Sequence, residues 1–172
     1  LGYERSSIQA LETATGIGRK SLYRAFTDKH DLFLKSLGAY RAMMAEENLA
    51  PLVAPDAGIG TIEALFDKFI GLAGTEMAAM GCLICNTALE RGADDAEAAR
   101  HVQGYFDQIR SAMRNSLARA AERGEIALGP DALDREANVL LGAVQSLCVL
   151  GRAGTDPDTM RDVARAATER LR

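Results

Sequence analysis

Two cysteines spaced as C-x-x-C have residue types and a spacing that can do chemistry. Cys82 and Cys85 lie about one helical turn apart, and such a pair serves in redox reactions or supplies half of a zinc site. A zinc site needs a second Cys or His pair, but the sequence adds only Cys148 and the separate histidines His30 and His101. We therefore expect no bound metal and no other cofactor.

The cysteine pair leaves three interpretations. Gly81 places Cys82 near a helix start, where amide dipoles favour the thiolate, so Cys82 can sense oxidants or electrophiles. A helical thiol peroxidase uses a similar pair, but the sequence "NTALE" after Cys85 places no proton-relaying histidine on the next turn. Alternatively, the cysteines pack as small apolar residues. We expect no enzyme activity, and for Cys82 both sensing and packing stay open.

A basic stretch, "GIGRKSLYRAF" at residues 16–26, stands out in a chain whose formal net charge is −4. Residues 1–41 carry a charge of +3 and the remainder −7. A basic N-terminal segment in an otherwise acidic chain suggests that this segment binds a polyanion. A solvated surface rich in Lys and Arg would give the same charge asymmetry.

Apolar residues recur at three- and four-residue spacing, and no sustained alternating pattern appears, so we expect an all-α fold. Helix-start signals lie at Ser6 (with a glutamine three residues on), at Asp94 and at Asp156, and stop signals at Pro51 and Gly124. The expected helices cover residues 6–14, 19–25, 28–48, 60–73, a short segment after Gly81, 94–124, 131–152 and 156–171.

The first two of these helices, joined by a glycine-containing turn, form a helix-turn-helix pattern. Ile17, Leu22 and Phe26 are expected to hold the second helix to the core, which turns its cations outward, where they can donate to guanine in the major groove. Hydroxyl and ammonium groups at the helix starts suit phosphates. The residues expected to contact DNA are Ser6, Arg19, Lys20, Ser21, Tyr23, Arg24 and Lys29.

The segment "GYERSSIQALETATGIGRKSLYRAFTDKHDLFLKSLGAY" resembles the DNA-binding region of the tetracycline-repressor (TetR) family of transcriptional regulators. It matches the family at Gly2–Tyr3, Gly16–Ile17, Leu22–Tyr23, Phe26, Lys29 and Leu32–Phe33. The sequences "GCLICNTALE" and "ARAAERGEI" resemble the C-terminal domain of one subgroup.

The resemblance implies a homodimeric repressor that binds double-stranded operator DNA and releases it when a small-molecule effector binds. It divides the chain into a DNA-binding domain at 1–45, whose first helix lies upstream of Leu1, and an effector-binding and dimerisation domain at 46–172. Gly18 replaces a serine that often caps the recognition helix in the family. We expect the helix over 28–48 to transmit the effector signal.

Methionine and aromatic residues of the second domain are core residues by default, but a pocket between its helices would be lined by the same residues. Asn86 and Gln145 are candidates for orienting a ligand. The expected pocket residues are Phe66, Phe69, Met77, Met80, Cys82, Asn86, Phe106, Met113 and Gln145. The last two helices are expected to form a four-helix bundle with a second copy through Leu140, Leu141, Val144, Leu147 and Val163.

No apolar run approaches the roughly 18 residues of a membrane span, and no leader resembles a signal peptide. Three cysteines, an odd number, fit a reducing compartment. We therefore expect a cytoplasmic protein without a membrane partner.

Overall fold

The computed structural model describes residues 2–172, which fold into helices without strands and so confirm the all-α prediction. In chain order the elements are α1 (Ile8–Thr15), α2 (Arg19–Ala25), α3 (Lys29–Met44), the π-helical turn η1 (Ala45–Leu49), α4 (Ala50–Val53), α5 (Ile59–Gly71), α6 (Glu76–Met80), α7 (Leu83–Arg91), α8 (Ala96–Glu122), α9 (Pro130–Arg152) and α10 (Pro157–Glu169).

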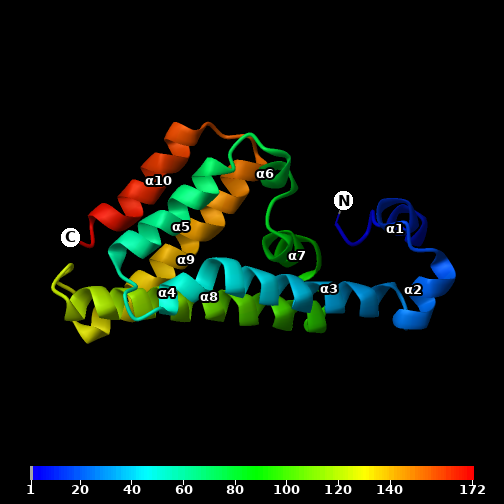
Figure 1. Ribbon diagram of the computed structural model, residues 1–172, viewed down its shortest axis with the longest axis horizontal. Coiled ribbons are helices and arrows are strands. Elements are labelled where there is room, and N and C mark those ends of the chain that lie inside the picture. The colour runs from blue at the N-terminus through cyan, green and yellow to red at the C-terminus, as the bar shows by residue number, and fades with distance from the viewer. Residues whose placement is uncertain (1) are drawn as a thin grey trace.

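The long helices α3 and α8 lie side by side along the molecule (Figure 1). Helices α1 and α2 form one end, α5, α9 and α10 pack together towards the other, and α7 lies between these two groups. The core between α5, α8, α9 and α10 is built from side chains with at most 1% of their surface exposed, among them Phe66, Met113, Leu140, Leu147 and Met160. These helices therefore form the body, to which α3 connects the small end.

Several helix boundaries match the sequence predictions, and two helices start one residue later than predicted. Gly16 ends α1 with φ 70°, a left-handed conformation that costs glycine little, and Asp156 caps α10. The caps of α1 and α8 are Ser7 and Asp95 rather than Ser6 and Asp94. The Ser6 hydroxyl instead donates to the Gly2 carbonyl, 2.6 Å away.

Helix α3 ends at Met44, before Pro51 as predicted, but helical structure continues past this end in η1 and α4. Pro51 lacks an N–H and its ring crowds the carbonyl four residues earlier, that of Glu47. The π turn η1 absorbs this conflict, with the Ala50 N–H bonded to the Ala45 carbonyl. The Lys68 ammonium then donates to the Glu47 carbonyl at 3.5 Å and to the Asn48 side-chain oxygen at 2.7 Å. The helical path therefore continues through Val53.

Helix α6 was not expected from the sequence. It has five residues between two glycines and is capped by the Thr75 hydroxyl, so it is too short to show a hydrophobic period. Among the described residues, no single helix is long and apolar enough to cross a membrane; only α5 and the α6–α7 segment reach that composition together, across a bend of 92°.

The Ser116 hydroxyl fastens α4 to α8 by donating to the Leu52 carbonyl at 3.0 Å, and both residues are fully buried. We expect Ser116→Ala to lower the free energy of unfolding by about 1–3 kcal/mol, because the buried carbonyl loses its donor. Urea denaturation would measure the change. The control is Ser111→Ala, an exposed position on the same helix, and equal stabilities of the two variants would contradict the assignment.

Candidate functional site

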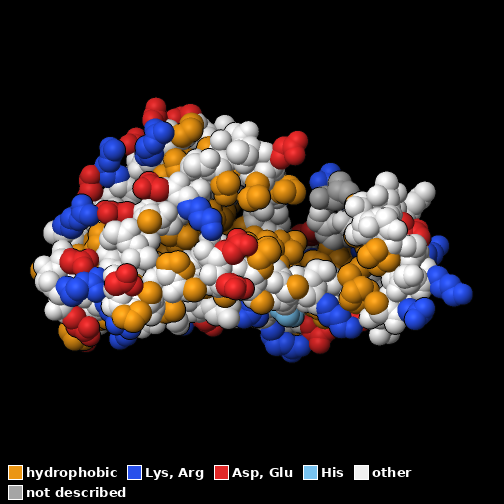
Figure 2. All heavy atoms as spheres, viewed as in Figure 1, with side chains coloured by type: hydrophobic (Ala, Val, Ile, Leu, Met, Phe, Trp, Pro, Cys, Tyr) orange, Lys and Arg blue, Asp and Glu red, His pale blue; other side chains and the backbone are white. Residues whose placement is uncertain are grey.

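Helix α2 presents its cations to solvent at one end of the molecule. Leu22 is 6% exposed and anchors the helix, whereas Arg19, Lys20 and Arg24 are exposed. Figure 2 shows Lys and Arg side chains projecting from this end. Tyr23 is 47% exposed, with the Arg19 guanidinium 5.8 Å from its ring centre. The expected base-reading residues are therefore accessible to solvent, as is Ser21.

Only one of the three predicted anchors of α2 is buried. Ile17 is 46% exposed, because it lies in the turn before the helix rather than on the inward face of α2. Phe26 is half-buried, with the Lys35 ammonium 5.3 Å from its ring centre. The prediction that Ile17 is a core residue is therefore wrong for the described chain.

The start of α2 has a cap that sequence reasoning missed. Gly18 has no side chain to accept the first free N–H groups, but the Glu12 carboxylate of α1 accepts the N–H of Arg19. The sequence signal for this cap was an acidic residue, Glu12, on the preceding helix. The substitution of the usual serine by Gly18 is thus compensated from α1.

Tyr3 attaches the small end to the body. Its N–H and that of Glu4 donate to the two carboxylate oxygens of Glu90 at 2.9 and 2.8 Å. The Lys29 ammonium lies 4.2 Å and the Arg91 guanidinium 4.8 Å from the Tyr3 ring centre. Lys29, expected at a phosphate, therefore also packs on this ring.

Asp95 is the charged group at the centre of the same contact, with 5% of its side chain exposed. It accepts the N–H groups of Glu97 and Ala98, lies 2.8 Å from the His30 ring nitrogen and 3.5 Å from the Arg91 guanidinium. Burial raises the pKa of Asp95, but the two N–H groups and His30 together lower it more, so this pKa lies below its usual value.

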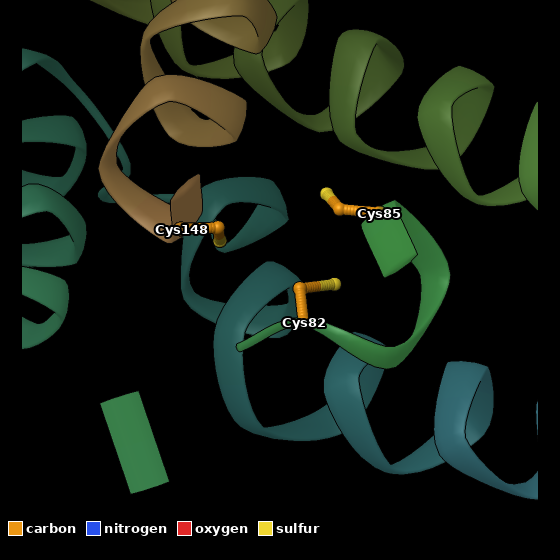
Figure 3. Close-up of side chains that lie close together, drawn as sticks. All are labelled: Cys82, Cys85 and Cys148. Carbon is orange, nitrogen blue, oxygen red and sulfur yellow. The ribbon is translucent and has the colours of Figure 1, made fainter. Parts of the chain in front are cut away.

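The three cysteines form one cluster, which the sequence analysis did not foresee. Cys82 is the N-cap of α7, Cys85 lies in its first turn, and Cys148 comes from α9. Their sulfur atoms all lie within 4.8 Å of one another, and all three residues are half-buried. Figure 3 shows the three side chains around a common space. Cys148 thus adds one further sulfur to the pair, although the second Cys or His pair of a zinc site is not part of this group.

Two tyrosines border this cluster. The thiols of Cys148 and Cys85 lower the pKa of Cys82, and the Tyr40 hydroxyl of α3 contributes in the same direction. Burial, followed by the interaction with Cys82, raises the pKa of Tyr40 and of Tyr105 on α8. Helices α3, α7, α8 and α9 thus all contribute side chains to the surroundings of Cys82.

The other expected pocket residues are spread between core and surface. Phe66 and Met113 are at most 1% exposed, whereas Met77 and Met80 are 59% and 66% exposed because they lie on the short outer helix α6. The Asn86 amide donates to the Met80 carbonyl and accepts from Arg152. The remaining three are half-buried: Phe69, Phe106 and Gln145.

A surface groove of about 320 Å³ lies between α5 and α10, and Phe66 is the one expected pocket residue in its lining. A second groove, of about 420 Å³, lies between η1–α4 and α8 and contains none of the expected residues. The exposed Met77 and Met80 and the packed Met113 therefore do not line either groove.

Three of the five expected dimer residues lie inside the chain's own core. Leu140, Val144 and Leu147 are 0%, 5% and 1% exposed, because α9 packs against α5, α8 and α10. Leu141 and Val163 are half-buried. The first three therefore cannot form the surface of an interface.

We expect Asp95→Asn to lower the free energy of unfolding at neutral pH by about 1–3 kcal/mol. Because the folded-state pKa is lowered, the charged form stabilises the fold above the usual aspartate pKa of about 3.9, and this stabilisation is lost as the pH falls through the folded pKa. The variant should therefore lose less stability on acidification than the parent, as measured by urea denaturation. Asp107→Asn, at an exposed ion pair on α8, is the control; identical pH profiles for the parent and Asp95→Asn would contradict the prediction.

Comparison with known proteins places this architecture in one family. Residues 58–167 match the family model described as "Tetracyclin repressor-like, C-terminal domain". The chain is 29% identical over 161 residues to the uncharacterized HTH-type transcriptional regulator YezE of Bacillus subtilis (strain 168), covering 94% of this chain and 83% of YezE.

Two solved structures share the fold. A TetR-family regulator from Agrobacterium tumefaciens superposes with a TM-score of 0.84 at 22% identity, covering 99% of this chain and 88% of that one. A cysteine mutant of the TetR-family regulator CifR, complexed with 26-base-pair operator DNA, gives a TM-score of 0.81 at 23% identity, covering 98% and 87%. The chain described here belongs to the TetR family of transcriptional regulators.

Proposed function

We propose that two copies of this chain bind a pseudo-palindromic operator duplex as a repressor, with each α2 in a major groove. The observation that carries this proposal is the exposed basic face of α2, fixed by Leu22 and by the Glu12 cap. Arg19 and Lys20 would read base edges, with the exposed Ser21 and Arg24 on the same helix. Ser6, Tyr23 and Lys29 would contact phosphates and set the register. The operator complex of CifR supports DNA as the partner.

In this proposal, residues 1–45 form the DNA-binding domain and 46–172 the effector-binding and dimerisation domain. The boundary falls where α3 passes into η1. The protein would act in the cytoplasm, with access to DNA, and as a regulator rather than an enzyme. The thiol-peroxidase alternative gains no support, since His30 is engaged by Asp95 beyond the far end of α7 from Cys82.

The dimer interface is proposed on the outer face of α9. Val139 and Val149 are 39% and 53% exposed, and with Gly142 and Ser146 they recur on one face at helical spacing. A methyl group placed on Gly142 would meet nothing within 4 Å, so a second helix can approach closely there. Helix α9 would pair with its symmetry mate, with α10 beside it, in a four-helix bundle.

Release of DNA is proposed to follow effector binding near α3. A specific alternative is covalent modification of Cys82, favoured by its position at the start of α7 and its two neighbouring thiols. An oxidant or alkylating agent would then add bulk between α7 and α9. The Tyr40 side chain beside Cys82 gives either kind of effector a direct connection to α3.

Selection from random duplexes should enrich one palindrome whose half-sites lie one DNA turn apart, roughly 34–36 Å. Lys29→Ala should weaken binding to all sequences and reduce the log–log salt slope by about 0.9 for each of the two Lys29 contacts in the dimer. Arg19→Ala or Lys20→Ala should also relax base preference. The control is Arg100→Ala, an exposed cation of α8. Recovery of no enriched palindrome would refute the operator proposal.

Val149→Glu should give monomers that no longer bind the operator tightly, because it places a charge in the proposed interface. Sedimentation at micromolar concentration would measure the oligomeric state. Leu89→Glu is the matched control, since Leu89 is 85% exposed on α7, outside the proposed interface. A monomeric parent protein, or a dimeric Val149→Glu variant, would show that the interface is wrong.

A further inference from the structure

Three thiols from two separate helices converge on one point. Cys82 and Cys85 are neighbours on one face of the start of α7, since residues three apart in a helix lie side by side. Cys148 reaches them from α9, and every sulfur lies within 4.8 Å of the other two. A shared ligand needs its donor atoms close together, and the three side chains gather in one small region (Figure 3).

The spacing of the sulfurs fits a metal ion better than isolated thiols. Metal–thiolate bonds are about 2.3 Å long, so sulfurs that share one ion lie about 4 Å apart. The cluster is therefore close to a binding geometry, and small side-chain rotations complete it. Thiolates are soft donors that select Cu(I) and zinc over oxygen-seeking ions.

The number of donors distinguishes these two ions. Structural zinc sites are almost always four-coordinate, but among the described residues the group around this point contains three ligands, all of them cysteines. Neither histidine belongs to this group: His30 bonds Asp95, and His101 lies beside Gly38 and Arg41. Three thiolates complete the coordination of a soft monovalent ion.

We propose that Cys82, Cys85 and Cys148 bind one Cu(I) ion as a trigonal thiolate site, and that this ion is the effector of the repressor. As each sulfur–copper bond forms, its thiol proton leaves to water, and no electron is transferred. Arg152 of α9 is hydrogen-bonded to Asn86 of α7, the residue that follows Cys85, and so joins the two helices that carry the thiols. The effector role rests on the proposed function, but the binding site does not.

Helix α7 connects this site to the DNA-binding end. Its first residues carry two of the thiols, and its last two residues hold the N-terminal segment: Glu90 accepts the N–H groups of Tyr3 and Glu4, and Arg91 pairs with Glu4 at 2.8 Å. Nine residues of helix span about 13 Å. Drawing the start of α7 towards Cys148 therefore shifts the contact that sets the position of α1 and α2.

The test uses the whole reduced protein without oxygen, titrated with Cu(I) against a Cu(I) chelator. We expect one ion per chain, and Cys82→Ser, Cys85→Ser and Cys148→Ser should each weaken binding by more than the roughly 100-fold that loss of an outer-shell partner costs. Met77→Leu, which removes an exposed sulfur outside the cluster, should bind as the parent does. Circular dichroism checks that each variant is folded.

Unchanged Cu(I) affinity in Cys148→Ser, tighter binding of Zn(II) than of Cu(I), or no binding by the parent would overturn the site. Operator binding is measured separately on the same samples. Metal-free protein that binds no duplex would refute the proposed function. The chelator titration would still show whether the three cysteines bind Cu(I). Release of the operator by Cu(I) is expected for the parent and not for Cys148→Ser; a copper-loaded parent that stays on DNA overturns the effector role.

Covalent sensing by Cys82 predicts a different pattern. Cys85→Ser and Cys148→Ser both keep the Cys82 thiol, so an alkylating agent such as iodoacetamide should still release DNA from them if modification of that one residue is sufficient. Release by iodoacetamide in these variants, without any response of the parent to Cu(I), would assign the cluster to electrophile sensing and overturn the metal proposal.

Discussion

The buried carboxylate of Asp95 links the start of α3 to the body of the molecule. It begins α8 by accepting two N–H groups, and the same side chain meets His30 at the start of α3 and Arg91 at the end of α7. Capping alone needs no buried charge, and an unpaired buried charge is costly. The arrangement is stable because the N–H groups of the cap, the His30 ring nitrogen and the Arg91 guanidinium all act on one carboxylate. Through His30 it holds the start of α3, the helix that follows α2.

Local signals predicted the elements that depend on neighbouring residues. The bounds of α2, the left-handed Gly16 and the Asp156 cap all follow from short-range rules. The cap of α8 was placed one residue early because two aspartates stand side by side there, and sequence alone does not show which one has the extended backbone of a cap.

Long-range proximity was harder to predict. Cys148 joins Cys82 because α9 crosses the start of α7, which no spacing in the sequence encodes. Leu140, Val144 and Leu147 were assigned to an interface because an amphipathic helix shows its apolar face but not what covers it; here the chain itself covers that face. The Glu12 cap on α2 was missed for the same reason, since it acts between helices.

The π turn before Pro51 makes one end of a long helical rod a fixed pivot. Within that turn Asn48 is tied to Lys68 of α5, and beyond it Leu52 is tied to Ser116 of α8, whereas the 16 residues of α3 extend from the turn for about 24 Å towards the basic end. A lever of that length moves its tip by about 0.4 Å for each degree of tilt. A displacement of the body that is too small to disturb its packing therefore produces a larger movement at the basic end. That end contacts DNA, whose grooves are regularly spaced.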